Sequence, residues 1–228
     1  MELKGIDKIY VISLDRRKDR WFEFFRKSKQ AGITNYEKWS ASDGTTMVYD
    51  DDVKYLFRDK IETYGRGIIG CAMSHYRLWR HCIDNDIDNV LVFEDDVFFP
   101  QKENTVEIWN NIVYPCIQKT KEDLHFMFPS SPYLCGIVHG ESKQVDGRLY
   151  LANSILERTF GYVITLKGMN KLIDIIDKRG INAPIDRFLQ SSRSKIPVHV
   201  CKVKLFVSPV YYKTDIQHDK QPIKLKNS

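Results

Sequence analysis

The sequence predicts an α/β fold, in which one largely parallel β-sheet is flanked by helices. Three observations support this prediction. Short segments rich in β-branched and aromatic residues alternate along the chain with segments of helical periodicity. Hydrophobic residues make up 43% and aromatic residues 12% of the 228 residues, which is enough material for a substantial core. No repeat or low-complexity linker divides the chain, so we expect a single domain over residues 1–228.

The elements follow from local patterns. Strands are expected at 8–14, 36–44, 90–99, 124–131, 158–165 and 198–212. Helices are expected at 15–32, 65–86, 105–118, 166–180 and 183–192. Gly32 and Gly180 are typical helix stops, and Pro115 is expected to break the third helix. The polar stretch 45–64 is expected to be irregular or weakly helical, and 132–150 a loop or hairpin.

The segment VLVFEDDVFF (90–99) places Glu94, Asp95 and Asp96 between two apolar runs. Burying an unpaired carboxylate is costly, so the acids must leave the core at a strand end or meet a positive charge there. In parallel α/β sheets, ligands bind beyond the carboxyl ends of the strands. Oxygen ligands of this type suit Mg²⁺ or Mn²⁺. The alternative is a solvated turn, which the apolar runs on both sides disfavour.

Alternation along a strand separates the three acids. Residues i and i+2 of a strand point the same way, so Glu94 and Asp96 are expected to share a face. Asp95 is then expected to point to the other side, unless the strand has already turned.

Several segments, taken in order, resemble glycosyltransferase family 25, which contains bacterial lipooligosaccharide galactosyltransferases and procollagen galactosyltransferases. They are IYVISLDRRKDRW, WSASDG, GIIGCAMSHYRLWRHCI and VLVFEDDVFF, followed by RTFGYVITLKGMNKLI and APIDRFL. The resemblance reaches about residue 190. It implies a GT-A type fold and a nucleotide-diphosphate sugar as donor, commonly UDP-galactose and often with manganese. Residues 1–130 would bind the donor and 131–228 the acceptor.

The resemblance also implies roles for individual residues. Asp96 would be the principal metal ligand, while Glu94 or Asp95 would contact the ribose or a metal-bound water. Asp186, in PIDRFL, would lie near the sugar or the acceptor as the candidate base, so Asp186 and Asp95 are the catalytic candidates. The nucleotide and donor would be surrounded by Ser13, Leu14, Asp15, Arg17, Asp43, Gly44, Gly70, Ser74, His75 and Glu94.

Each of these roles has a structural alternative. Arg17 can be a surface residue of an amphipathic helix, and Gly70 an ordinary entry into a helix. His75 can be a structural histidine with satisfied hydrogen bonds. Asp186 follows Pro184, so it can instead serve the first turn of a helix.

The C-terminal stretch YYKTDIQHDK (211–220) offers a further metal ligand. Asp215, His218 and Asp219 are the candidates, and His218 is the one we select because manganese accepts imidazole. The alternative is a polar tail.

The predicted reaction is transfer of a galactose- or glucose-type sugar from a UDP-sugar to a hydroxyl, with inversion and with Mn²⁺ or Mg²⁺ as cofactor. The expected partners are the donor and a glycan, a lipid-linked saccharide or a hydroxylysine-type protein acceptor, and not nucleic acid. The net charge of +5 fits a phosphorylated ligand without requiring one. Two alternatives remain open: a metal-dependent nucleotide-sugar hydrolase or phosphotransferase, and a catalytically silent binding module.

Cysteine usage and the chain ends suggest a compartment. The five cysteines include no CxxC pair, so reduced thiols are expected, and a redox or zinc site is disfavoured on that spacing. The first residues carry too short an apolar stretch for a signal peptide, which favours the cytoplasm. The basic end KQPIKLKNS allows loose membrane contact, and a domain excised from a larger protein of the secretory pathway remains open.

Overall fold

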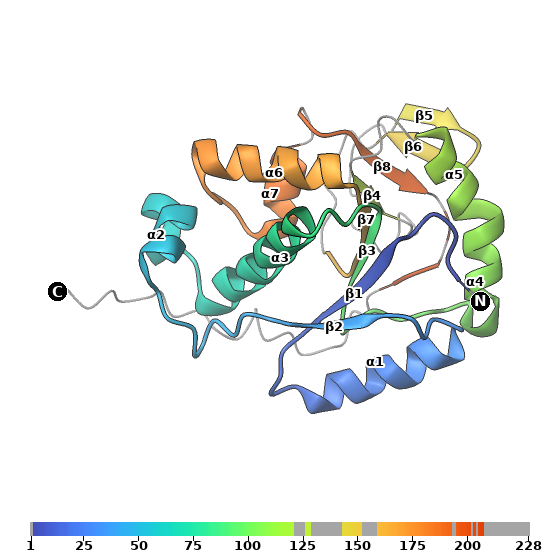
Figure 1. Cartoon of the computed structure of the whole chain (residues 1–228), viewed down its shortest axis with the longest axis horizontal. Coiled ribbons are helices and arrows are strands. Elements are labelled where there is room, and N and C mark those ends of the chain that lie inside the picture. The colour runs from blue at the N-terminus through green and yellow to red at the C-terminus, as the bar shows by residue number, and fades with distance from the viewer. Residues whose placement is uncertain are drawn as a thin grey trace.

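The computed structural model describes residues 2–120, 126–128, 143–151, 159–192, 195–201, 203 and 205–207. Eight described strands form one sheet in the order β2-β1-β3-β7-β4-β8-β6-β5. The strands are β1 Lys8–Ser13, β2 Glu37–Ser40, β3 Val90–Glu94, β4 Phe126–Phe128, β5 Lys143–Asp146, β6 Leu149–Leu151, β7 Gly161–Ile164 and β8 Val198–Cys201. Helices flank the sheet, with α3 and α6 on the left of Figure 1 and α4 and α5 on the right.

The predicted α/β fold with a helix-flanked sheet is confirmed. The helices are α1 Lys18–Gln30, α2 Asp51–Phe57, α3 Arg66–Asp84, α4 Thr105–Ile108, α5 Tyr114–Lys119, α6 Leu166–Arg179 and α7 Ile185–Ser191. The stretch expected to be irregular or weakly helical contains α2 followed by a 3₁₀ helix at Arg58–Thr63. The stretch 132–150 includes the described hairpin of β5 and β6; its other residues lie outside the described ones.

Pro115 does not break its helix. It lies in the first turn of α5, which directly continues the helical residues Trp109–Val113. The irregularity comes just before it, as a π-helical turn at Trp109–Val113 between α4 and α5.

The direction of the strands places the carboxyl ends of the first three at one edge. β1 runs parallel to β2 and to β3, and β4 runs parallel to β8. The remaining pairs, including β7 with both of its neighbours, are antiparallel. Because β7 runs the opposite way beside β3, the residues that precede β7 lie next to the end of β3. The chain therefore brings residue 159 to the acids at 94–96.

Aromatic side chains fill the two faces of the sheet. Phe93 contacts Phe24 of α1 and Phe206, with ring centroids 6.1 and 4.8 Å away. On the opposite face, Tyr162 contacts His75 of α3, with centroids 5.7 Å apart. These side chains are buried. Both helices are therefore held to the sheet mainly because apolar surface is removed from water. Among the described residues, no helix is long and apolar enough to cross a bilayer.

Two glycines let the start of α3 contact the loop after β2 backbone to backbone. A Cβ atom on Gly70 would lie 2.5 Å from the Ser42 carbonyl oxygen, and one on Gly44 would lie 1.8 Å from the Arg66 carbonyl oxygen. Ser74 completes the contact: its hydroxyl accepts from the Ser42 N–H at 2.8 Å and donates to the Gly70 carbonyl at 2.7 Å. This contact fixes the loop that carries Asp43.

We predict that Gly70→Ala lowers the free energy of unfolding by about 1–3 kcal/mol, because the backbone of the loop must move to admit the methyl group. Arg80→Ala, on the exposed face of the same helix, is the control and should change stability by less than about 0.5 kcal/mol. Urea unfolding measures both. Equal stability of Gly70→Ala and the wild type would contradict the close contact.

Candidate active site

The three acids occupy a tight turn at the end of β3. The N–H of Val97 donates to the Glu94 carbonyl at 3.1 Å, so residues 94–97 form a turn with Asp95 and Asp96 at its centre. The chain then pairs again with the sheet, since the Phe98 N–H donates to the Val207 carbonyl at 2.7 Å. This second pairing explains why an apolar run resumes directly after the charges.

Asp95 turns into the protein, away from the face of Glu94, as strand alternation predicted. Its two carboxylate oxygens accept from the Ser13 hydroxyl at 2.8 Å and from the Arg20 guanidinium at 3.3 Å. Burial raises the pKa of Asp95, and the contacts with Ser13 and Arg20 only partly offset this. These contacts join the ends of β1 and β3 to α1, so they show a structural role; the predicted catalytic role stays a prediction.

Glu94 lies at the boundary between core and solvent, with 23% of its side chain exposed. One carboxylate oxygen lies 3.3 Å from His75 Nε2 and also accepts from the Thr159 hydroxyl. Burial acts to raise the pKa of Glu94, but the hydrogen bonds from His75 and Thr159 outweigh it and the net pKa is lowered. Glu94 is therefore held ionised and oriented at neutral pH.

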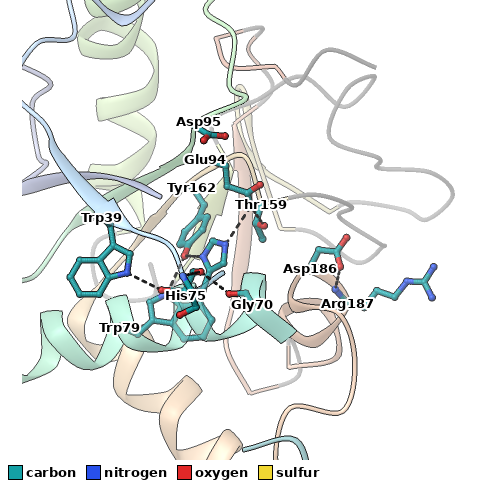
Figure 2. Close-up of polar contacts among 12 residues, drawn as sticks. Trp39, Gly70, His75, Trp79, Glu94, Asp95, Thr159, Tyr162, Asp186 and Arg187 are labelled. Carbon is teal, nitrogen blue, oxygen red and sulfur yellow. Dashed lines mark hydrogen bonds and ion pairs between the residues drawn. The ribbon is translucent and has the colours of Figure 1, made fainter. Parts of the chain in front are cut away.

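A buried chain of hydrogen bonds fixes the ring of His75. The Tyr162 hydroxyl lies 2.7 Å from His75 Nδ1, and Trp79 Nε1 donates to the same hydroxyl at 3.1 Å. One arrangement of protons satisfies every contact: Trp79 donates to Tyr162, Tyr162 donates to Nδ1, and Nε2–H donates to Glu94. Figure 2 shows this chain running from α3 through β7 to the end of β3.

Two further predicted acids share the electrostatic environment of Cys71. Burial raises the pKa of the Cys71 thiol, and the negative charges of Glu94, Asp186 and Asp96 raise it further. The thiol sulfur, a His75 nitrogen and a Glu94 oxygen also lie within 4.8 Å of one another. The fold therefore brings Cys71 and His75 of α3 close to Glu94, and the charges of Asp96 and Asp186 act on the same thiol from the β3 turn and from α7.

Asp186 lies in the first turn of α7, as its sequence context allowed. One of its carboxylate oxygens accepts from the Arg187 N–H at 2.8 Å, which orients the side chain. Figure 2 shows Asp186 to one side of Glu94 and Thr159, on a different element.

A second group of predicted residues lies on the loops after β1 and β2. Asp43 accepts from Arg16 Nε at 2.6 Å and from the Thr45 hydroxyl at 2.6 Å. Burial acts to raise the pKa of Asp43, but these contacts lower it overall. The structure thus brings Asp43 of one loop to Arg16 of the other.

Other predicted residues of these loops also have hydrogen-bond partners. Asp15 accepts from Lys38 at 2.7 Å and from the Ser40 hydroxyl at 2.5 Å. Arg17 donates two hydrogen bonds to Asp19, at 2.7 and 2.9 Å. The half-buried Leu14 contributes its carbonyl to a turn at the Arg17 N–H, 2.9 Å away.

The sequence analysis did not identify Cys71, Thr159 and Tyr162 as site residues, although the sequence carried a signal for Cys71. Cys71 and His75 are four residues apart on one helix, which is a recognisable ligand spacing. Thr159 and Tyr162 carry no such signal, because only the antiparallel register of β7 brings them to His75 and Glu94. Asp215, His218 and Asp219 lie outside the described residues.

Comparisons with known proteins point to one family. The family model described as "Glycosyltransferase family 25 (LPS biosynthesis protein)" matches residues 6–189. "Procollagen galactosyltransferase 2" from Homo sapiens is 29% identical over 209 residues, covering 85% of this chain and 31% of the human protein. "Glycosyltransferase 25 family member" from Anopheles gambiae is 28% identical over 191 residues, covering 74% of this chain and 29% of that protein. The chain thus spans less than a third of the length of these two relatives.

Solved structures also align along most of the chain. The crystal structure of a glycosyltransferase involved in the glycosylation of the major capsid of PBCV-1 is 10% identical, with a TM-score of 0.44, and the alignment covers 90% of this chain and 94% of that one.

We predict that Asp95→Ala lowers the free energy of unfolding by about 1–3 kcal/mol, because Ser13 and Arg20 both lose a buried charged acceptor. Asp15→Ala is the matched control, since Asp15 also accepts from a serine and a cation but is 68% exposed. That change should cost less than about 1 kcal/mol. Urea unfolding compares the two variants. Equal losses in the free energy of unfolding would show that burial of the Asp95 contacts does not increase their contribution to stability.

Proposed function

The chain belongs to glycosyltransferase family 25, and from this premise we propose that it transfers a galactose- or glucose-type sugar from a UDP-sugar to a hydroxyl group. The acceptor class is a glycan, a lipid-linked saccharide or a protein side chain. The observation that carries the proposal is the position of Glu94 and Asp96 in the turn at the carboxyl end of β3, in the parallel part of the sheet formed with β1 and β2. The galactosyltransferase names of relatives support the choice of sugar.

Manganese or magnesium is the cofactor that the family implies, and the residues at the β3 turn fit such an ion. Glu94 and Asp96 are partly exposed and supply the oxygen ligands that hard cations prefer, whereas both oxygens of Asp95 are already engaged. We assign Asp96 as the principal ligand, with Glu94 beside it and His218 as a further ligand from the C-terminal region. Bound there, the ion would offset the charge of the departing diphosphate.

The side chains of this chain supply the remaining chemistry. Asp186 is assigned as the general base, which takes the proton of the acceptor hydroxyl while that oxygen attacks the anomeric carbon, with inversion. Glu94, held ionised by His75 and Thr159, accepts a hydrogen bond from a donor hydroxyl. The loops that carry Ser13, Asp15, Arg17 and Asp43 line the nucleotide.

A metal-dependent nucleotide-sugar hydrolase would use the same carboxylates. The two activities separate by their dependence on acceptor, because a hydrolase releases UDP at the same rate with or without one.

We predict that UDP raises the melting temperature of the protein in the presence of Mn²⁺ more than in its absence, because bound ligand stabilises the folded state. Asp96→Asn should remove most of the Mn²⁺-dependent part of this shift. Asp174→Asn, an exposed acid of α6, is the control and should keep it. A thermal-shift assay measures all three proteins. A wild type that does not respond to UDP, with or without metal, would exclude both the transferase and the hydrolase.

We predict that Asp186→Asn lowers the rate of sugar transfer by about 10²–10⁴-fold while leaving the KM for the UDP-sugar nearly unchanged, because the base acts on the acceptor and not on donor binding. UDP release is measured across a panel of UDP-sugars and acceptors. Transfer at the wild-type rate would remove Asp186 from the role of base.

A further inference from the structure

Three side chains of different chemistry converge beside the carboxylate cluster. The Cys71 sulfur, a His75 ring nitrogen and a Glu94 oxygen lie within 4.8 Å of one another. Cys71 and His75 are one turn apart on α3, and Glu94 meets them from the end of β3. Bonds from Zn²⁺ to such atoms measure about 2.0–2.3 Å, so displacements of about 1 Å bring all three onto one ion.

We propose that Cys71, His75 and Glu94 form a Zn²⁺ site with three protein ligands and an open fourth position. A thiolate and an imidazole favour zinc over manganese or magnesium, which prefer oxygen ligands. This site is therefore distinct in its chemistry from the oxygen site assigned to Asp96, although the two share Glu94. It does not depend on the proposed sugar transfer.

The histidine is already held in the orientation that a ligand needs. Its Nδ1 lies 2.7 Å from the Tyr162 hydroxyl, which is itself held by Trp79, so Nε2 faces Glu94. A metal-binding histidine usually donates its second ring N–H to a fixed partner, and the Tyr162 hydroxyl oxygen becomes that partner when the ring proton moves to Nδ1. The side chains of His75, Trp79 and Tyr162 are buried, so the ring is fixed by packing as well as by hydrogen bonds.

The charges balance when the ion binds. Zn²⁺ replaces the Cys71 thiol proton, which goes to solvent, and the imidazole proton moves from Nε2 to Nδ1. Nδ1–H then donates to the Tyr162 hydroxyl oxygen, and the hydroxyl proton of Tyr162 rotates away from the ring. The thiolate and the Glu94 carboxylate then neutralise the two charges of the ion. Asp96 and Asp186 add negative potential at the same place, and the partial exposure of Cys71 and Glu94 leaves a path for entry.

Occupation by zinc has a consequence for the site described above. Glu94 cannot serve the donor while it binds zinc, so zinc inhibits binding of the donor. This consequence, unlike the site itself, rests on the proposed function.

The site is tested with Co²⁺ as a spectroscopic probe for zinc. The wild type should show a thiolate-to-cobalt charge-transfer absorption in the near ultraviolet, and added Zn²⁺ should abolish it. Cys71→Ser should lack this absorption, and Glu94→Gln should bind Co²⁺ at least 10-fold more weakly. Cys82→Ser, a buried thiol of the same helix outside the cluster, is the matched control and should keep the absorption.

The outcomes separate the site from the transferase. No charge-transfer absorption in the wild type, or its persistence in Cys71→Ser, overturns the zinc site whether or not the protein is a transferase. Circular dichroism and the melting temperature of each variant establish that it is folded before its spectrum is compared. If transfer activity is found, Zn²⁺ should inhibit the wild type at concentrations at least 10-fold lower than those needed for Cys71→Ser. If no transfer is found, the cobalt spectrum still decides the metal site.

Discussion

The turn at 94–97 is the feature on which the rest of the site depends. Three acids in succession can end a buried strand only if their charges go to different places, because the core does not tolerate unpaired carboxylates. Asp95 goes inward, where its carboxylate accepts hydrogen bonds from Ser13 and Arg20 and so joins β1, β3 and α1. Glu94 and Asp96 remain at the partly exposed edge, where they are accessible to a ligand. Because Asp95 is paired inside the protein, only Glu94 and Asp96 have to lie where solvent or a ligand can reach them.

Glu94 is held by elements distant in sequence. β7 runs antiparallel between β3 and β4, so that Thr159 and Tyr162 flank Glu94 and His75. The hydrogen bonds that link Trp79, Tyr162 and His75 are buried, and the one from His75 to Glu94 is partly buried. This makes the geometry rigid, because a broken bond among the first three residues would leave an unpaired polar group in the core. The close backbone contact at Gly44 and Gly70 likewise fixes the position of the loop after β2.

The proposed donor site and the proposed zinc site follow from the same arrangement. Carboxylates gathered at the end of parallel strands suit a hard cation and a diphosphate, whereas the addition of Cys71 and His75 at one corner provides softer ligands. Sharing Glu94 makes the two uses mutually exclusive. A single residue at the boundary of core and solvent therefore connects the chemistry proposed for this family member to a metal that could regulate it.

Much of this was readable from residue patterns. The alternation of elements predicted the α/β fold, and the three acids at 94–96 predicted the end of a strand. Period-two alternation predicted that Asp95 points away from the face of Glu94. Each prediction depends on local geometry that a few neighbouring residues determine. The antiparallel register of β7 was not readable, because pairing between distant strands leaves no local signal, and with it Thr159 and Tyr162 were missed. The contact of Gly70 and Ser74 with the loop after β2 was not predicted, since only packing determines which backbone comes within reach of a side chain, and their place beside the donor stays a prediction. Cys71 became a candidate ligand for the same reason: its partner Glu94 is 23 residues away and reaches it only through the contact of α3 with the end of β3.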